Sequence, residues 1–129
     1  MTPSQALSQT TVSNLTADKS QVVIGAKKSE TVYTGAQGEE KASKTYNYNA
    51  LGTVIKTTTV FSYTLDTLSS SITYKDKDGS VMQSETFYVG NEGEEKAQKT
   101  YNYNFAGTDV KTTTVFSYTY DTLTSSVSY

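Results

Sequence analysis

The chain contains two tandem copies of one segment, and this duplication constrains its fold more than any other feature. The segment from Ser29 to Tyr74 recurs from Ser84 to Tyr129 at a constant offset of 55 residues, and 33 of the 46 aligned positions are identical. Short tandem units usually pack against one another, because one unit alone cannot bury a sufficient core. We therefore expect one continuous array rather than two separate domains.

The repeat divides the chain into three segments, which we expect to pack as one continuous unit. They are an N-terminal cap or partial repeat (residues 1–28), repeat 1 (29–83) and a truncated repeat 2 (84–129). In the cap, Pro3 favours a short helix up to Leu7, and Val22 to Ile24 are apolar enough for an edge strand. Repeat 2 stops where repeat 1 enters its connector, so we expect a longer parent array.

Turn-forming residues divide each unit into about four strands. Starting in the first unit they fall near Gly52, Asp66 and Asp78 with Gly79, and the next lies at Gly90 to Gly93 in the second unit. Connections this short allow antiparallel hairpins, whereas helical crossovers need a dozen or more residues between strands. The sequence therefore predicts an all-β fold, either a tandem-repeat antiparallel meander or a β-hairpin solenoid.

The composition predicts a folded chain with a thin core. Hydrophobic residues make up 35% of the chain, and Leu, Ile, Val and Phe together supply 24 of 129 positions, which is close to the range of disordered proteins. The net charge of −2 and the many Thr and Tyr residues favour a pleated sheet instead. Alternation should place Ile55, Thr57 and Thr59 on one side and Lys56 and Thr58 on the other, so neither side is strongly apolar.

Missing residue types exclude several classes of function. The chain has no Cys and no His, and each of its 11 basic residues is Lys. Thiolate metal sites, thiol nucleophiles and hydroxyl nucleophiles activated by His are therefore excluded. The absence of Arg and a pI near 5.0 argue against nucleic-acid binding. We expect no enzyme activity, no cofactor and no membrane span, since the longest apolar run near the N-terminus, Gln21–Ala26, is too short to cross a bilayer.

One stretch in repeat 1 resembles a calcium-binding loop in its spacing. Placing Gly79 at the sixth loop position puts Glu85 at the twelfth, with Asp76 and Asp78 nearby, but Tyr74 then occupies the first ligand position. A hairpin tip, in which Asp favours the turn and Gly adopts positive φ, explains the same residues. We favour the hairpin tip and keep Asp76, Asp78 and Glu85 as a weak metal-site hypothesis.

The motif KTYNYN occurs once in each repeat and offers a candidate ligand-binding surface. In a strand it places Tyr46 and Tyr48 on one face, and Tyr101 and Tyr103 on the equivalent face of the second copy. Paired aromatic rings beside Lys stack on sugars or bases. A cross-strand ladder that covers a sheet poor in Leu and Ile is the alternative, and we favour it over glycan binding.

Recurring aromatic, turn and glycine elements such as YNYNALGTVIKTTTVFSY resemble the hairpin repeats of bacterial secreted and cell-surface proteins, including the tyrosine-aspartate (YD, Rhs-type) class. The dipeptide Tyr120-Asp121 matches that class, although no Gly follows it. The resemblance covers the two repeats and not the first 28 residues. It implies an array that is secreted or displayed on the cell surface, and it supplies no catalytic residues.

These observations lead to three functional hypotheses. The first is a non-catalytic structural or adhesive repeat module of an extracellular bacterial protein. The second is a fibre subunit that associates with itself, in which the strand Leu123 to Tyr129 pairs with an N-terminal strand of the next molecule. The third is a module that binds surface glycans through its tyrosines. The second hypothesis predicts a particle mass that grows with concentration.

Overall fold

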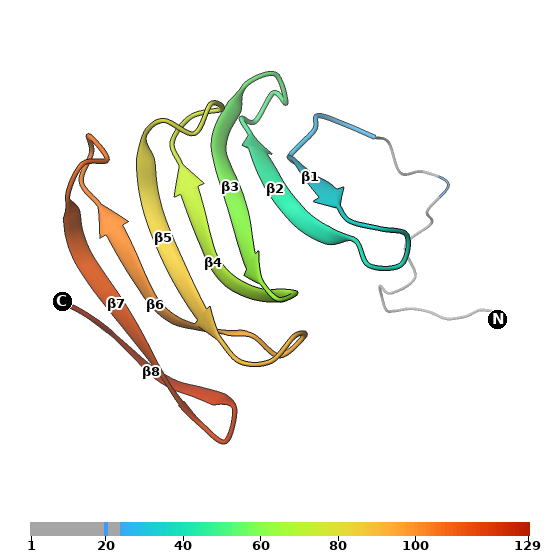
Figure 1. Cartoon of the computed structure of the whole chain (residues 1–129). Coiled ribbons are helices and arrows are strands. Elements are labelled where there is room, and N and C mark those ends of the chain that lie inside the picture. Colours follow the sequence, from blue (N-terminus) through green and yellow to red (C-terminus); the bar gives the residue numbers. More distant parts are fainter. Residues whose placement is uncertain (1–19, 21–23) are drawn as a thin grey trace, which may run out of the picture.

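The computed structural model describes Ser20 and residues 24–129, and within them the chain forms one open sheet (Figure 1). Its strands are β1 (Ser29–Thr34), β2 (Lys41–Tyr48), β3 (Ile55–Thr64), β4 (Thr67–Tyr74), β5 (Met82–Val89), β6 (Lys96–Tyr103), β7 (Val110–Thr119) and β8 (Thr122–Ser128). The spatial order is the sequence order, and each neighbouring pair is antiparallel. The predicted all-β antiparallel meander is confirmed.

The two sequence copies follow one another along this sheet with the same strand register. Thr31 lies opposite Thr45 between β1 and β2, and Thr86 lies opposite Thr100 between β5 and β6, 55 residues further on. The pairs of β2 with β3 and of β3 with β4 also recur at this offset in β6, β7 and β8. The β4–β5 pairing is therefore the strand junction between the copies.

Residues directly opposite one another on neighbouring strands share a face, so the register defines the two faces of the sheet. One face, here called the Lys–Tyr face, carries Glu30, Lys44, Tyr46, Thr58, Tyr74, Glu85, Phe87, Lys99 and Tyr101. The other, here called the Thr face, carries Thr31, Thr45, Thr59, Thr73, Thr86, Thr100 and Thr114.

Hydroxyl pairs link neighbouring strands on the Thr face. The Oγ1 atoms of Thr31 and Thr45 lie 2.9 Å apart, and the same distance separates those of Thr59 and Thr73. The equivalent pair in the second copy, Thr86 with Thr100, lies at 2.8 Å. Cross-strand Thr pairs of this kind stabilise antiparallel sheets by a few tenths of a kcal/mol to about 1 kcal/mol each.

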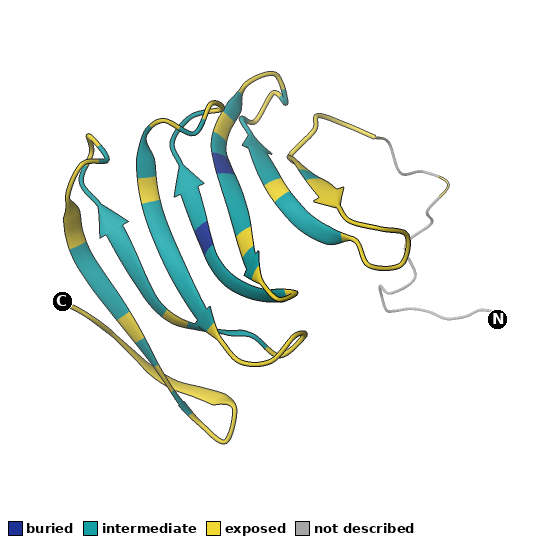
Figure 2. Cartoon of the chain, viewed as in Figure 1, coloured by how far each residue is buried: buried dark blue, intermediate teal, exposed yellow. Residues whose placement is uncertain are grey.

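The thin hydrophobic core expected from the composition is not formed by the described residues. None of their hydrophobic side chains is buried, and the two buried residues are polar: Thr58, 2% exposed, and Ser71, 7% exposed. Figure 2 shows both in the middle of the sheet, on β3 and β4. Thr58 lies opposite Tyr46 on one side and Tyr74 on the other, so these neighbouring tyrosines shield it. Strand pairing and half-buried side chains hold this single layer together.

The same type of side-chain cap occurs in three of the longer loops. In the β2–β3 loop, Asn49 Oδ1 accepts hydrogen bonds from the N–H groups of Thr53 (2.9 Å) and Val54 (3.3 Å). Asn104 Oδ1 makes the equivalent contacts in the β6–β7 loop. Asp76 Oδ1 accepts from the N–H groups of Ser80 and Val81 in the β4–β5 loop. A side-chain oxygen that caps its own loop is a common use of Asn and Asp in turns.

The β3–β4 and β7–β8 connections are two-residue turns with positive φ at both positions. Leu65 and Asp66 have φ of 49° and 70°, and Tyr120 and Asp121 have φ of 50° and 68°. Two consecutive left-handed residues are typical of the type I′ turn, which matches the twist of a hairpin. These turns explain why Asp66 marks a strand boundary in the sequence.

Strand bulges alter the alternation expected in β3. The register between β2 and β3 shifts between Asn47, opposite Thr57, and Tyr48, opposite Ile55. Lys56 is therefore left without an opposite residue, and Ile55 pairs on the face of Tyr48 rather than on the face of Thr57 and Thr59. The predicted side for Ile55 was wrong, because a bulge adds one residue to one strand only.

The N-terminal predictions fall largely outside the described residues. The helix up to Leu7 and the Val22 and Val23 part of the edge strand lie there, whereas Ile24 is 96% exposed and precedes β1. Within the described part of the chain, no helix has the length and apolar character needed to cross a membrane.

Candidate functional site

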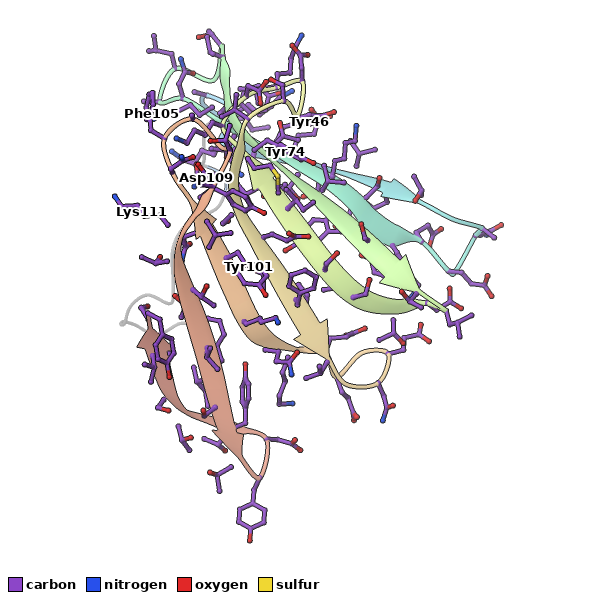
Figure 3. All side chains as sticks on the ribbon, turned by 60° about the vertical axis from the view of Figure 1, so that its left-hand side comes forward. Tyr46, Tyr74, Tyr101, Phe105, Asp109 and Lys111 are labelled. Atoms are coloured by element: carbon purple, nitrogen blue, oxygen red, sulfur yellow. The ribbon has the colours of Figure 1, made fainter. Side chains whose placement is uncertain are left out.

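The four tyrosines of the KTYNYN motifs form two separate pairs. Tyr46 and Tyr48 lie on β2, and Tyr101 and Tyr103 lie on β6, with both pairs on the Lys–Tyr face. Figure 3 labels one tyrosine of each pair, Tyr46 and Tyr101. Four strand spacings separate β2 from β6, a distance of about 19 Å. The structure therefore makes two equivalent aromatic patches and does not bring the four rings into one cluster.

Lysine side chains lie against the rings of both patches. Lys27 Nζ is 5.1 Å from the centroid of Tyr48, and Lys99 Nζ is 5.2 Å from that of Tyr101. Phe87 packs edge-on against Tyr101, with ring centroids 5.7 Å apart. Burial raises the pKa of the Tyr103 phenol above its ordinary value. These contacts fit the cross-strand ladder, and the glycan-binding hypothesis stays a prediction.

The three acidic residues of the calcium hypothesis occupy different environments. Asp76 caps its own loop, where the Ser80 hydroxyl also donates to it, and this hydrogen bond lowers the pKa of the Asp76 carboxyl. Asp78 is exposed at the tip of that loop, whereas Glu85 lies within β5 opposite Ile72. Among the described residues, no group of three acidic, His or Cys side chains is arranged to hold a metal ion.

Two depressions occupy equivalent places at the β1–β2 and β5–β6 loops. The sequence analysis did not predict them. The first, of about 600 Å³, is lined by Thr34, Gly35, Ala36, Gly38, Glu39, Glu40, Lys41, Tyr63, Asp66 and Glu92. The second, of about 540 Å³, is lined by Val89, Gly90, Asn91, Gly93, Glu94, Lys96, Tyr118 and Asp121. The sequence feature that could have indicated these depressions is the identity of their lining residues in both copies: Lys41, Tyr63 and Asp66 recur as Lys96, Tyr118 and Asp121.

Two polar contacts involve lining residues of the first depression, one between the copies and one within the first copy. Lys41 Nζ lies 2.9 Å from Glu92 Oε2, and this hydrogen bond raises the pKa of the Lys41 ammonium. The Tyr63 hydroxyl donates to the carbonyl oxygen of Ala42 at 2.8 Å, and burial raises the pKa of that phenol. The Lys41–Glu92 contact thus holds the β5–β6 loop of the second copy against the first copy.

A further contact joins the copies beside this depression. The N–H of Leu68 donates to Glu95 Oε2 at 3.0 Å, and this hydrogen bond lowers the pKa of the Glu95 carboxyl. Leu68 lies at the start of β4, and Glu95 lies in the loop before β6. Glu95 of the second copy therefore has a specific role at the junction between the copies.

The two edges of the sheet are the remaining candidate surface. β1 and β8 occupy opposite ends of the strand order (Figure 1). Every residue of β8 is exposed, whereas the equivalent strand β4 is half-buried or buried throughout. The same sequence pattern thus lies in two environments, one inside the sheet and one at its edge.

Comparison of this chain with protein-family models, with curated proteins and with solved structures found no match.

Proposed function

We propose that this chain is a non-catalytic structural repeat module of an extracellular bacterial protein, in which each copy lengthens one continuous sheet by four strands. The observation that carries this proposal is the β4–β5 junction, where the two copies join by ordinary antiparallel pairing. Ser71 lies opposite Thr86, and Thr73 lies opposite Ser84. A junction made by the strands themselves, without a linker domain, allows further copies to be added in the same way.

Side-chain contacts reinforce this junction at both ends of the strands. At one end, Lys41 pairs with Glu92, and Glu95 accepts from the Leu68 N–H. At the other end, Lys75 Nζ donates to the Phe105 carbonyl oxygen at 2.7 Å. Such contacts between neighbouring units favour a stiff array over a chain of independent domains.

The shifted ionisable groups also support a structural role. Asp76 accepts from amides of its own loop, and Glu95 and Lys41 each bind a group of the other copy. Each of these pKa shifts has a hydrogen bond within the sheet or its loops as its largest cause. We include an extracellular location and an adhesive role of the two faces in this proposal because the repeats resemble YD-type repeats.

A chain with one additional copy of residues 29–83, inserted after Gln83, tests the proposal. Four more strands should lengthen the particle by up to about 19 Å, and small-angle scattering measures this change. A control carries Thr73→Pro, which removes an amide that the register directs towards β5. The proposal predicts one cooperative unfolding transition for the three-copy chain and loss of that single transition in the control. A three-copy chain that scatters as flexibly linked, independently unfolding units would reject it.

A further inference from the structure

We propose that the β8 edge of one molecule pairs with the β1 edge of a second copy, in the register of the internal β4–β5 junction. This inference rests on the proposed function, because it uses the junction between copies as its template. β8 is the repeat equivalent of β4, and β1 is the repeat equivalent of β5. Each molecule therefore presents both halves of a junction that it already contains once.

The register of the intermolecular pairing follows from the internal one. Ile72 lies opposite Glu85 and Ser70 lies opposite Phe87 in the β4–β5 pair. Shifting β4 and β5 to their repeat equivalents places Val127 opposite Glu30 of the second copy, and Ser125 opposite Val32 of the second copy. The interface is head-to-tail, so it leaves a free β1 at one end and a free β8 at the other and supports linear growth.

On β8, the backbone N–H and C=O groups that point away from β7 belong to the residues that the proposed register needs for pairing with β1. Thr113 and Tyr129 exchange both backbone hydrogen bonds, at 3.2 and 2.8 Å, which makes them a hydrogen-bonded pair. Because such pairs alternate along an antiparallel ladder, the N–H and C=O groups of Ser126 and Ser128 point away from β7. Their equivalents Ser71 and Thr73 pair with β5 inside the sheet.

The side chains of β8 are more exposed than those of its repeat equivalent β4. Ser71 is 7% exposed, whereas its equivalent Ser126 belongs to a strand in which each residue is exposed. Leu123 and Val127 are 53% and 46% exposed, although their equivalents on β4 are half-buried. A second copy on this edge would cover the same side chains that β5 covers on β4.

The residues of β1 and β8 themselves give little protection against strand pairing. Edge strands of soluble proteins usually contain charges, Pro or inward-pointing Lys that prevent association. β8 has no charged residue and no Pro, and β1 has Glu30 as its one charged residue. The interface chemistry is that of one strand adding to another, with side-chain pairs of Ser, Thr and Val and the single carboxylate of Glu30.

Side-chain contacts of the internal junction are largely repeated at the edges. Ser71 Oγ and the Tyr88 hydroxyl lie 3.0 Å apart, and their equivalents are Ser126 and Tyr33 of the second copy. The Lys41–Glu92 ion pair is not repeated, because the equivalent of Glu92 is Gln37, and the Lys75–Phe105 contact has no counterpart, because residues 84–129 include no equivalent of Lys75. The intermolecular junction therefore lacks both contacts and should be weaker than the internal one.

Disulfide trapping tests the register, since the chain has no Cys. Val127→Cys and an isotope-labelled Glu30→Cys are mixed at high concentration and oxidised, and the mixed dimer is identified by its mass. Residues at these non-hydrogen-bonded positions have close Cβ atoms. A mixture of Val127→Cys with Val32→Cys represents a slip of two residues. The intramolecular control is one chain carrying Ile72→Cys and Glu85→Cys.

The proposal predicts that the Val127 and Glu30 mixture cross-links at least about tenfold faster than the slipped mixture. Equal rates, or no mixed dimer while the internal control closes, would overturn the intermolecular register and leave the structural module intact. Failure of the internal control to close would instead contradict the β4–β5 junction, and with it the proposed function.

A gain-of-function variant provides an independent readout. Gln37→Glu restores the carboxylate that Glu92 supplies at the internal junction, opposite Lys96 of the neighbouring molecule. An exposed ion pair of this kind should tighten association about twofold to fivefold at low salt, and added salt should reverse the gain. Sedimentation across a concentration series measures this change. A variant that associates no more tightly than the parent, or one whose gain is insensitive to salt, would contradict the predicted contact.

Discussion

The side chains of Ser71 and Tyr88 meet across the junction between the two copies, with Ser71 Oγ 3.0 Å from the Tyr88 hydroxyl. Ser71 is one of the two buried residues among those described, so its hydroxyl depends on this partner. An unmade hydrogen bond at a buried polar group costs more than one at an exposed group, because water cannot replace the partner. The contact therefore marks the place where the sheet is most sensitive to a change at the junction.

Tyr88→Phe should lower the free energy of unfolding by about 1 kcal/mol, because it removes the hydroxyl and keeps the ring. Tyr33→Phe is the matched control, since Tyr33 is the repeat equivalent of Tyr88 and is 60% exposed on β1. Urea denaturation of both variants at low protein concentration measures the difference. Equal losses in the two variants would mean that the Ser71 contact does not stabilise the junction.

The type I′ turn at Leu65 offers a stabilising substitution. Leu65 adopts φ of 49° and is 94% exposed, so it pays a left-handed backbone cost without gaining packing. Because Asn tolerates this conformation far better, Leu65→Asn should raise the free energy of unfolding by about 1 kcal/mol. Leu65→Val, which is β-branched, should lower it. Thermal unfolding of the two variants provides the test, and a fall in stability for Leu65→Asn would contradict the turn assignment.

Gly107 and Gly93 allow two structural reasons for a glycine to be compared, which are a positive φ and a close approach to another backbone segment. Both have positive φ, 75° and 85°, but a Cβ on Gly107 would lie 2.8 Å from the Met82 N atom, whereas a Cβ on Gly93 would meet nothing within 4 Å. Gly93→Ala should therefore cost about 1–2 kcal/mol for its backbone conformation alone. Gly107→Ala should cost about 1–3 kcal/mol more, because the β5 backbone must move. Urea unfolding measures both, and equal costs would mean that the predicted contact with Met82 is absent.

Turn chemistry explains why much of the fold was predictable. Gly52, Asp66 and Gly79 were read as strand boundaries, and each has a positive φ in the structure. Few residue types tolerate that conformation, so it leaves a clear signal in the sequence. Short connections then leave antiparallel neighbours as the simplest topology, which is what the sheet shows.

Features that depend on distant strands were not predictable. The alternation of residues in β3 does not indicate whether a second layer covers the half-polar faces of the sheet. A thin core was therefore expected, whereas the described residues form a single layer. The bulge at Lys56 depends on how β3 pairs with β2, and it moved Ile55 to the other face. The first depression was missed for the same reason, because it unites Lys41 and Tyr63 with Glu92 of the following copy.

The loop cap at Asp76 should make stability depend on pH below the ordinary carboxyl range. Hydrogen bonds from Ser80 and Val81 lower the pKa of Asp76 below its ordinary value of 3.8. A lowered carboxyl pKa contributes stability that is fully present above the ordinary value and is lost as pH falls through the folded-state value. Protonation of Asp76 in acid should therefore weaken the cap and lower the melting temperature.

Asp76→Asn separates the charge from the cap, because Asn49 and Asn104 cap the equivalent loops with a neutral amide oxygen. This variant should keep most of its stability at pH 7 and show a smaller fall in melting temperature between pH 5 and about pH 2. Asp76→Ala should lower the melting temperature already at pH 7, because the cap is lost. Asp78→Asn makes the same charge change at an exposed position of the same loop and serves as the control. Thermal unfolding across pH decides the question: if the acid response of Asp76→Asn equals that of Asp78→Asn, the Asp76 hydrogen bonds are not its source.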